Sequence, residues 1–371
     1  MKSLCIIIPC LNEQDSISFC LEKIKNVLEK EHIEKTEIIV VDNNSTDNTA
    51  EIAKKLNVRV ITENKKGYGN AVKTGMKSTT CEFVAIADGD DSYDFNELGK
   101  FIQKAKEGYE FIQGCRFKKY GGKIMPGAMP FSHQYIGNPF LSFMTKLFFG
   151  IKPNDVYCGF RMYKRSVYEK NFYFSTGMEF NIESVIKLYN GTKKYIEIPI
   201  TLSKDKRKNS TSHLRTFTDG IKTLKFILLA GSQIPSLIIS LAFMLISIKY
   251  FLNFDATPES LKVNFLISTV SLFASIQFIF FSLFANLASI YLGFRKNNFV
   301  LKIYKFLSFN KALLFSLLLL IFSLLFFFNI KFQFLNIGNY SLMYGLTVLG
   351  ISIQLLMNVL IVSVLDFFKK N

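Results

Sequence analysis

The pattern of apolar residues changes once along the chain, near residue 225. Before that point, short continuous apolar runs alternate with segments in which apolar residues recur every three or four positions, which predicts strands alternating with helices. The predicted strands are 4–8, 38–41, 58–61, 83–86 and 109–113, and the predicted helices are 17–28, 49–56, 69–76 and one that begins near residue 95. Repeated strand-helix-strand units with right-handed crossovers build a mixed, mostly parallel sheet flanked by helices, so we expect an α/β domain.

Beyond residue 225 the apolar runs become much longer. Four of them can each cross the roughly 30 Å hydrocarbon core of a bilayer, the third being near the short limit: 226–248, 265–292, 312–328 and 341–364. Lys and Arg concentrate in the loop after the second run and in the C-terminal tail, which the positive-inside rule places in the cytoplasm together with the first domain. The sequence therefore predicts an α/β domain over residues 1–225 and an all-α transmembrane domain of four helices over 226–371.

Charge and cysteine content narrow the class of protein. The chain has 45 Lys and Arg against 29 Asp and Glu, a net charge of +16 that suits nucleic acid, anionic lipid or phosphorylated substrates. Because most of the 39 Phe residues fall in the second half, where charge is sparse, we expect a membrane rather than a nucleic acid as partner. The six Cys residues all lie in the first half without a Cys-x-x-Cys pair, which favours reduced cytosolic thiols over zinc or disulfides.

Four polar clusters follow predicted strands: 9–13, 42–49, 65–71 and 87–94. Ligands of such sheets bind at the carboxyl ends of the strands. A carboxylate at position 42 can accept a hydrogen bond from the N–H edge of uracil or guanine, and Asp47 or Asn48 can cap the next helix. Any one of these clusters alone is also explained as a polar turn.

The acidic cluster carries the most specific chemistry. Asp88 and Asp90, separated by one residue after a buried strand, can chelate a hard divalent cation that in turn binds a phosphate. The alternative is a solvated acidic turn in which Asp94 caps a helix that begins near Phe95. Asp91, Ser92 and Asp94 could each be a ligand, a cap or a bystander.

Taken together, the segments Pro9–Glu13, Val41–Asp47, Gly67–Ala71 and Asp88-Gly89-Asp90 resemble the family 2 glycosyltransferases, which have the Rossmann-like GT-A fold. The branch that they resemble is the dolichyl- and undecaprenyl-phosphate sugar synthases. The likeness covers roughly residues 1–225. It implies a nucleotide-sugar half (about 1–115) and an acceptor half (about 116–225).

The resemblance also implies roles for individual residues on the donor side. Eight residues would bind a UDP- or GDP-linked sugar: Pro9, Asn12, Glu13, Asp42, Asn44, Lys66, Gly69 and Asp88. Asp88 and the catalytic Asp90 would hold Mg²⁺ or Mn²⁺ against the donor diphosphate. Members of this branch often carry Gln where Ser92 stands, so the third ligand is the Ser92 hydroxyl or a water molecule.

On the acceptor side, the resemblance assigns the phosphate of a polyprenyl lipid to four residues: Arg116, His133, Lys204 and Arg207. His133 stands where better-known synthases have an arginine, so contact with phosphate there would be weaker or pH-dependent. The resemblance also implies that Arg207, with or without Lys204, closes over the donor and acceptor phosphates. The basic segment 204–215 can equally be a solvated linker or a patch attracted to anionic headgroups. The apolar helix expected over 140–148 suits either the membrane interface or an ordinary core.

Two further carboxylates resemble positions near the family's catalytic centre. Asp155 begins an Asp-x-x-x-Gly-Phe-Arg segment, and Glu179 opens a helix. Either could act as a base, or could orient the cations that bind the acceptor. A polyprenyl phosphate has a second pKa of about 6 and is mostly dianionic at neutral pH, so it can attack without a base. We therefore favour orientation.

These inferences predict a metal-dependent, inverting hexosyltransferase that moves a sugar from a nucleotide sugar to a polyprenyl phosphate. It would be a multi-pass protein of the plasma or inner membrane in a prokaryote, and its helices could also join copies into a homo-oligomer. One alternative is a processive polysaccharide synthase, which is disfavoured because such enzymes usually carry Gln-x-x-Arg-Trp and this chain has no Trp. Another is a non-catalytic nucleotide-binding membrane adaptor, which the pair Asp88 and Asp90 disfavours.

Overall fold

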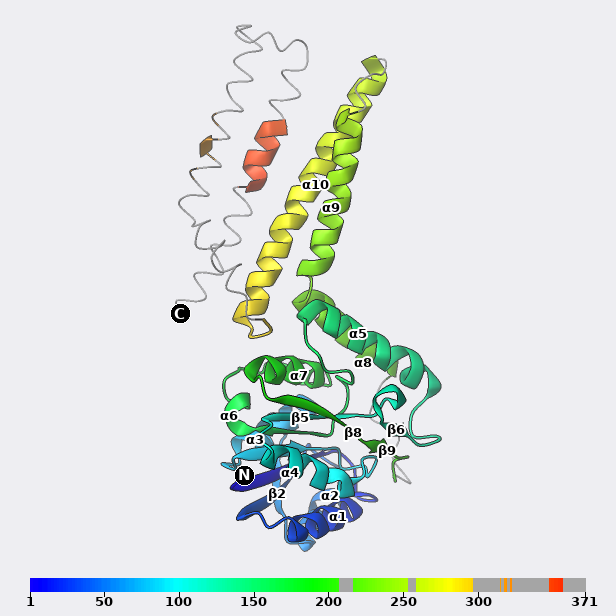
Figure 1. Ribbon diagram of the computed structural model, residues 1–371, viewed down its shortest axis with the longest axis vertical. Coiled ribbons are helices and arrows are strands. Elements are labelled where there is room, and N and C mark those ends of the chain that lie inside the picture. The colour runs from blue at the N-terminus through cyan, green and yellow to red at the C-terminus, as the bar shows by residue number, and fades with distance from the viewer. Residues whose placement is uncertain are drawn as a thin grey trace. The chain divides into compact units, whose positions relative to one another are not determined.

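A computed structural model describes residues 1–206, 216–252, 258–295 and 347–355, with positions 314, 317, 318 and 321. The chain divides into two compact units, Met1–Leu228 and Leu229–Asn371. Figure 1 labels the elements of both.

The described strands are β1 (Ser3–Cys10), β2 (Lys35–Asp42), β3 (Arg59–Thr62), β4 (Phe83–Ile86), β5 (Phe111–Cys115), β6 (Lys123–Ile124), β7 (Arg161–Lys164), β8 (Tyr195–Pro199) and β9 (Thr201–Leu202). The described helices are α1 (Ile17–Lys30), α2 (Thr49–Lys55), α3 (Tyr68–Lys77), η1 (Phe95–Glu97), α4 (Leu98–Lys106), η2 (Lys118–Tyr120), η3 (His133–Gly137), α5 (Asn138–Phe149), α6 (Arg165–Tyr168), α7 (Phe180–Gly191), α8 (Thr216–Ala230), α9 (Gln233–Leu252) and α10 (Pro258–Tyr291).

The first unit is built on a seven-stranded sheet with the order β3-β2-β1-β4-β7-β5-β8, beside a small parallel pair formed by β6 and β9. Four of the six pairings in the large sheet are parallel, and β7 runs antiparallel to both β4 and β5. The predicted mixed, mostly parallel α/β sheet is therefore confirmed. Strands β7 and β8 were not predicted, and β7 separates β4 from β5 in space.

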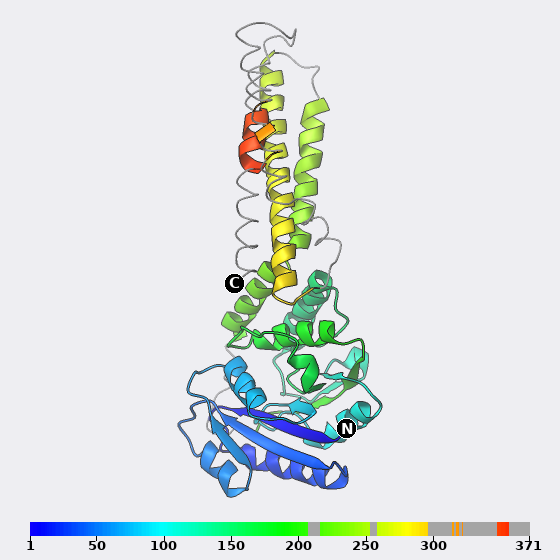
Figure 2. The same cartoon turned by 90° about the vertical axis from the view of Figure 1, so that its left-hand side faces the viewer.

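Helices cover both faces of this sheet (Figure 2). Leu4 and Ile6 of β1 belong to the same buried apolar cluster as Ile24 of α1. On the other face α3 approaches so closely that a Cβ atom on Gly75 would lie 2.6 Å from Cγ2 of Ile7. Because both faces are covered, the central strands are continuously apolar rather than alternating, which is the pattern seen in the sequence.

In the second unit, α9 and α10 pack as an antiparallel pair along a seam of serines. The Ser240 hydroxyl donates to the Ser275 carbonyl at 3.0 Å, and the Ser247 hydroxyl donates to the Ser268 carbonyl at 2.9 Å. Small residues that let helices approach, with hydroxyls that bond across the interface, are typical of helices packed in a bilayer.

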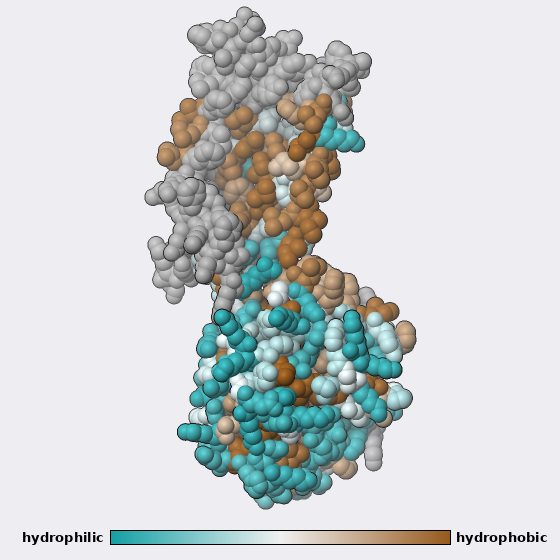
Figure 3. Space-filling view, viewed as in Figure 1, coloured by the Kyte–Doolittle hydropathy of each residue, from teal (hydrophilic) through white to brown (hydrophobic). Residues whose placement is uncertain are grey.

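Both helices are long and apolar enough to cross a membrane, over Gln233–Leu252 and Val263–Tyr291. Only 17% and 22% of their most apolar stretches are buried, so most of each stretch is exposed. Apolar side chains cover the visible surface of this pair (Figure 3). Large exposed side chains on it include Leu237, Ile238, Leu241, Leu245, Leu266 and Val270.

The predicted first span, 226–248, is wrong in its bounds. α8 ends at Ala230, and a new helix begins at Gln233 after a two-residue turn. Ile227 is fully buried, so the start of the predicted span belongs to α8. The predicted span 265–292 falls almost wholly within α10, and whether it crosses a membrane stays a prediction. Most of 312–328 and 341–364 lies outside the described residues, so the region of four helices stays a prediction.

Candidate functional site

Three of the four polar clusters meet at one edge of the sheet. Strands β1, β2 and β4 are mutually parallel, so their carboxyl ends share that edge, and Cys10 lies opposite Asp42 in register. The Cys10 thiol is buried there, and its pKa is raised first by that burial and then by the charges of Glu13, Cys20, Asp42 and Asp88. The carboxylates predicted for the donor site are therefore gathered around one buried side chain.

The first cluster is joined to the second by reciprocal hydrogen bonds. Asn12, with φ of 56°, accepts at Oδ1 from the backbone N–H of Thr46 at 2.8 Å. The backbone N–H of Glu13 donates to Oγ1 of Thr49 at 2.8 Å. Asp47 accepts from the Thr49 N–H at 3.0 Å and so bonds the first residue of α2, whereas Asn48, at the N-cap position, makes no side-chain capping bond. These bonds hold the first and second polar clusters against each other.

The residues predicted to contact the nucleotide have different exposures. Asp42 is only 6% exposed and accepts from the backbone N–H of Ser45 at 3.3 Å. Asn44, in the left-handed region with φ of 63°, is exposed. Pro9 and Lys66 are partly buried and exposed respectively. A base bound here would meet a nearly buried carboxylate with exposed side chains at its rim.

The sequence interpretation missed Asn43, a buried residue that links the second cluster to the third. Its Nδ2 donates to the carbonyls of Glu63 and Lys65, both at 2.9 Å, and its Oδ1 accepts from the Gly67 N–H at 2.7 Å. One amide side chain thus sets the course of residues 63–67. The only signal in the sequence was a second polar residue directly after the strand tip.

The glycines of the third cluster pack against the chain's own backbone. A Cβ atom on Gly69 would lie 2.6 Å from the carbonyl oxygen of Ser175, and one on Gly67 would lie 2.3 Å from that of Thr176. The role of Gly69 in binding the donor stays a prediction. This close packing places the partly buried Glu179, at the start of α7, near the third cluster.

The acidic loop begins directly after β4. A Cβ atom on Gly159 would lie 3.0 Å from Oδ2 of Asp88, so that carboxylate rests against a bare backbone. Asp90 accepts at Oδ1 from the backbone N–H of Ser92 at 3.0 Å. Asp94 accepts from the Asn96 N–H at 3.1 Å and caps η1, as predicted. Asp88, Asp90 and Ser92 are each partly exposed, which leaves them accessible to a ligand.

The oxygen ligands of this loop suit a hard cation whose remaining ligands come from a substrate. Within residues 1–206 and the other described parts of the chain, no group of three or more His, Cys, Asp or Glu side chains could hold a metal. Asp88 and Asp90 supply two carboxylates, and Mg²⁺ usually keeps waters and binds through one or two carboxylates plus substrate phosphates. The residues therefore fit a metal bound together with a diphosphate.

Arg116 and Asp155 form a buried ion pair that the sequence did not predict. Nε and Nη2 of Arg116 donate to the two carboxylate oxygens of Asp155 at 2.7 and 2.8 Å, and the Arg116 backbone N–H adds a third bond at 3.0 Å. The two side chains are 7% and 0% exposed. Asp155 is thus paired with a cation, which is consistent with the orienting role that the sequence favoured over a base. The contact of Arg116 with acceptor phosphate stays a prediction.

The basic segment starts beside the acidic loop. Tyr93 and Leu202 form an antiparallel bridge, and the Ser203 N–H donates to the Ser92 carbonyl at 2.7 Å. Lys204 is exposed and follows directly. Its contact with phosphate stays a prediction. Arg207 lies outside the described residues.

The segment around His133 and α5 has one buried and one exposed apolar side. His133, partly buried, opens the π-helix η3. Leu141 and Phe148 of α5 are buried. Large apolar side chains on the other side are 48–72% exposed: Phe131, Tyr135, Ile136, Phe140, Phe143 and Leu147. The helix thus buries one apolar side and exposes another, which is typical of a helix at a membrane interface.

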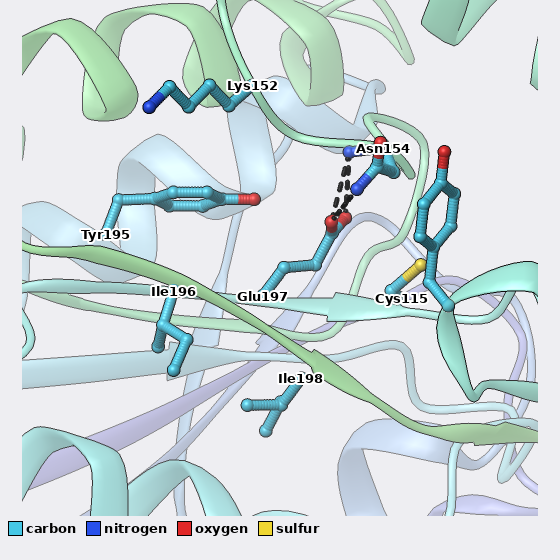
Figure 4. A pocket seen from close by; sticks show the side chains of 8 residues that line it. Cys115, Lys152, Asn154, Tyr195, Ile196, Glu197 and Ile198 are labelled. Carbon is cyan, nitrogen blue, oxygen red and sulfur yellow. Dashed lines mark hydrogen bonds between the residues drawn. The ribbon is translucent and has the colours of Figure 1, made fainter.

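A cavity of about 430 Å³ lies along the edge strand β8 (Figure 4). It is lined by Cys115, Tyr120, Lys152, Asn154, Tyr195, Ile196, Glu197 and Ile198. Glu197 accepts from the backbone N–H of Asn154 at 2.9 Å and from that of Asp155 at 3.0 Å, and burial raises its pKa. No residue predicted for the site lines this cavity. The Glu197 carboxylate instead holds residues 154 and 155, next to the Arg116–Asp155 pair.

The fold is an α/β domain that carries an acidic loop at the carboxyl edge of its sheet. Residues 5–172 match the family model described as Glycosyl transferase family 2. The chain is 33% identical over 115 residues to Protein RfbJ of Shigella flexneri, across 31% of this chain and 85% of that protein. The chain therefore belongs to glycosyl transferase family 2.

Other relatives are larger or more distant. The chain is 34% identical over 227 residues to the low-salt glycan biosynthesis hexosyltransferase Agl6 of Haloferax volcanii, across 61% of this chain and 53% of that protein. It is 28% identical over 200 residues to a dolichyl-phosphate hexose transferase of the same organism, across 53% and 81%. The chain thus spans about half the length of the first curated relatives it matches.

Among solved structures, glucosyl-3-phosphoglycerate synthase from Mycobacterium tuberculosis, in complex with Mn²⁺, UDP and glucosyl-3-phosphoglycerate, is similar with a TM-score of 0.48. The identity is 17%, across 62% of this chain and 79% of that one.

Proposed function

We propose that this chain transfers a sugar from a nucleotide sugar to the phosphate of a polyprenyl phosphate, with inversion, and releases a nucleoside diphosphate. The observation that carries the proposal is that Glu13, Asp42 and Asp88 follow the mutually parallel strands β1, β2 and β4 and therefore gather at the carboxyl edge of the sheet. The basic segment that begins beside the acidic loop supplies cations at the same place.

On the donor side, the nearly buried Asp42 would accept from the N–H edge of the base, which uracil and guanine both offer. Exposed Lys66 would lie near the phosphates. Asp88 and Asp90 would hold Mg²⁺ or Mn²⁺, which neutralises charge on the leaving diphosphate when bound. Ser92 supplies a hydroxyl or leaves the third position to water.

On the acceptor side, the sequestered Asp155 favours a nucleophile that needs no base. A sugar hydroxyl must be deprotonated as it attacks, whereas a phosphate monoester with a second pKa of about 6 is already dianionic. His133 would contact that phosphate, and Lys204 would contact both it and the donor phosphates. The printed name of one relative, a dolichyl-phosphate hexose transferase, supports this acceptor class.

The membrane-facing parts fit a lipid acceptor. The exposed apolar side of α5 would lie in the interface, and α9 and α10 would cross the bilayer as part of the predicted four-helix domain. The catalytic domain and the C-terminus would face the cytoplasm. A lipid phosphate at headgroup depth would then reach the carboxyl edge of the sheet.

The test incubates membranes carrying the chain with radiolabelled UDP- and GDP-sugars plus polyprenyl phosphate. We expect one donor to give a lipid-extractable label that mild acid releases as a single sugar, and NMR of the product to show an inverted anomeric configuration. A polymeric label would indicate the processive synthase instead. No labelled lipid from any donor would point to a non-catalytic adaptor.

Two matched variants of the acidic loop test the metal assignment. Asp90→Asn should lower kcat by about 10²- to 10³-fold, which is the usual cost of losing one group that stabilises developing charge. Asp94→Asn removes a carboxylate from the same loop but keeps a side chain able to cap η1, so its turnover should stay near that of the wild type. Near-normal activity in Asp90→Asn contradicts the assignment.

A further inference from the structure

Asp91 joins the acidic loop to two distant parts of the first unit. Nζ of Lys23, on α1, lies 2.8 Å from Oδ1 of Asp91 and 3.0 Å from Oδ2. Nζ of Lys206 lies 2.7 Å from Oδ2. The Asp91 side chain is 1% exposed, and the residue has φ of 59°, a conformation that residues other than glycine rarely adopt. This geometry turns the carboxylate inward, so Asp91 is an ion-pair residue rather than a ligand.

Lys206 is held by more than this ion pair. Its backbone N–H donates to the Asp90 carbonyl at 3.1 Å, and its ammonium lies 4.2 Å from the centre of the Phe19 ring. A cation over an aromatic ring adds to the attraction of the carboxylate. Lys206 is therefore fixed from three sides, although its side chain is 45% exposed.

The segment 203–206 is thereby attached to the acidic loop at both ends. Ser203 donates to the Ser92 carbonyl, and Lys206 donates to the Asp90 carbonyl. Lys204 lies between these two attachments, within one residue of the first. With two lysines on one aspartate, the cluster keeps an excess positive charge beside Asp88 and Asp90, which suits a bound diphosphate.

We propose that Asp91 is a positioning residue that acts through Lys206: it holds residues 203–206 against the acidic loop so that Lys204 stays within reach of the donor phosphates. The donor and its phosphates come from the proposed function, on which this inference rests. A purely structural alternative exists, in which Asp91 only ties α1 to the loop through Lys23. The two readings predict different effects for the two lysines.

The experiment combines hydrogen exchange with kinetics on the full chain in detergent. Backbone amides of Ser203 and Lys206 should exchange about tenfold faster in Asp91→Asn and in Lys206→Met, because a lost charge-assisted contact is worth about one order of magnitude. Lys23→Met should leave both amides unchanged. Lys104→Met, which removes an exposed partner of Glu107 on α4, is the matched control.

The kinetic arm measures KM for the donor and kcat separately. In Asp91→Asn and Lys206→Met we expect the donor KM to rise by about tenfold and kcat to change less than KM. Lys206→Arg, which keeps the charge, should restore wild-type values. Because the Lys206 side chain is half-exposed, we expect its variants to fold. They therefore test the proposal even if Asp91→Asn does not fold.

Two results overturn the proposal. One is unchanged exchange at Ser203 and Lys206 in both Asp91→Asn and Lys206→Met. The other is faster exchange with an unchanged donor KM. If the wild-type chain transfers no sugar from any donor, the proposed function fails, whereas the exchange data still decide whether Asp91 holds the segment.

Discussion

Replacing Asp155 by asparagine tests the buried ion pair with Arg116. The guanidinium makes two bonds to the Asp155 carboxylate and is 7% exposed, so the variant leaves a buried positive charge facing a neutral amide. Breaking one partner of a buried pair costs about 3–5 kcal/mol. In a unit of this size, each kcal/mol shifts Tm by about 2–4 °C, so we expect Tm to fall by about 6–20 °C.

The cysteines provide the assay. All six are free and buried, and all lie in Met1–Leu228, so a thiol-reactive fluorogenic dye reports unfolding of that unit during a temperature ramp in detergent. Arg165→Met is the control: its ion pair with Glu169 is 31% and 53% exposed, so the loss should stay below about 1 kcal/mol.

A Tm for Asp155→Asn within about 3 °C of the wild type would refute this reasoning, since it falls below the smallest shift expected for a broken buried pair. Arg116→Lys tests the predicted contact with acceptor phosphate separately. Loss of a phosphate contact should raise the KM for the acceptor, and loss of the ion pair should lower Tm.

Three further changes test other parts of the site. Gly69→Ala should cost about 1–3 kcal/mol in the same dye assay, because its Cβ would lie 2.6 Å from the Ser175 carbonyl; an unchanged Tm contradicts the close packing. Asn43→Ala leaves the Gly67 N–H without its partner and should cost about 1–3 kcal/mol; hydrogen exchange unchanged at Gly67 would oppose this. Burial raises the pKa of Glu197, so the folded state holds this proton more tightly than the unfolded state does. The free energy of unfolding should therefore fall as pH rises from about 4.5 through that raised pKa. Glu197→Gln should lose this pH dependence, and a pH profile identical to that of the wild type contradicts the assignment.

The donor half of the site was predictable because it depends on local pattern. Continuous apolar runs identified β1, β2 and β4, and strands joined by helical crossovers must run parallel. The polar residues that follow those runs then lie at one edge, which is where Asp42 and Asp88 are found. Asp47 and Asp94 each accept a hydrogen bond from the backbone N–H two residues further on, and such local bonds can be predicted from residue type.

The acceptor half was less predictable because its contacts are long-range. β7 carries Arg161 and Lys164 beside apolar residues and has no clear period, and its place between β4 and β5 depends on which strands it meets in three dimensions. Arg116 lies directly after β5, where a ligand contact was plausible. Its partner Asp155 is 39 residues further along the chain, a distance that no local pattern reports.

The sequence by itself determined the class of fold and which polar residues, Asp42 and Asp88 among them, follow strands at one edge of the sheet, because hydrophobic period and strand-end position are local properties. Only the tertiary structure decided how charged and small residues are used. It showed that Gly69 makes room for the chain's own backbone and that Arg116 and Asp155 neutralise each other. It also showed that Asp91 faces two lysines, since burial and pairing depend on residues that are distant in the sequence.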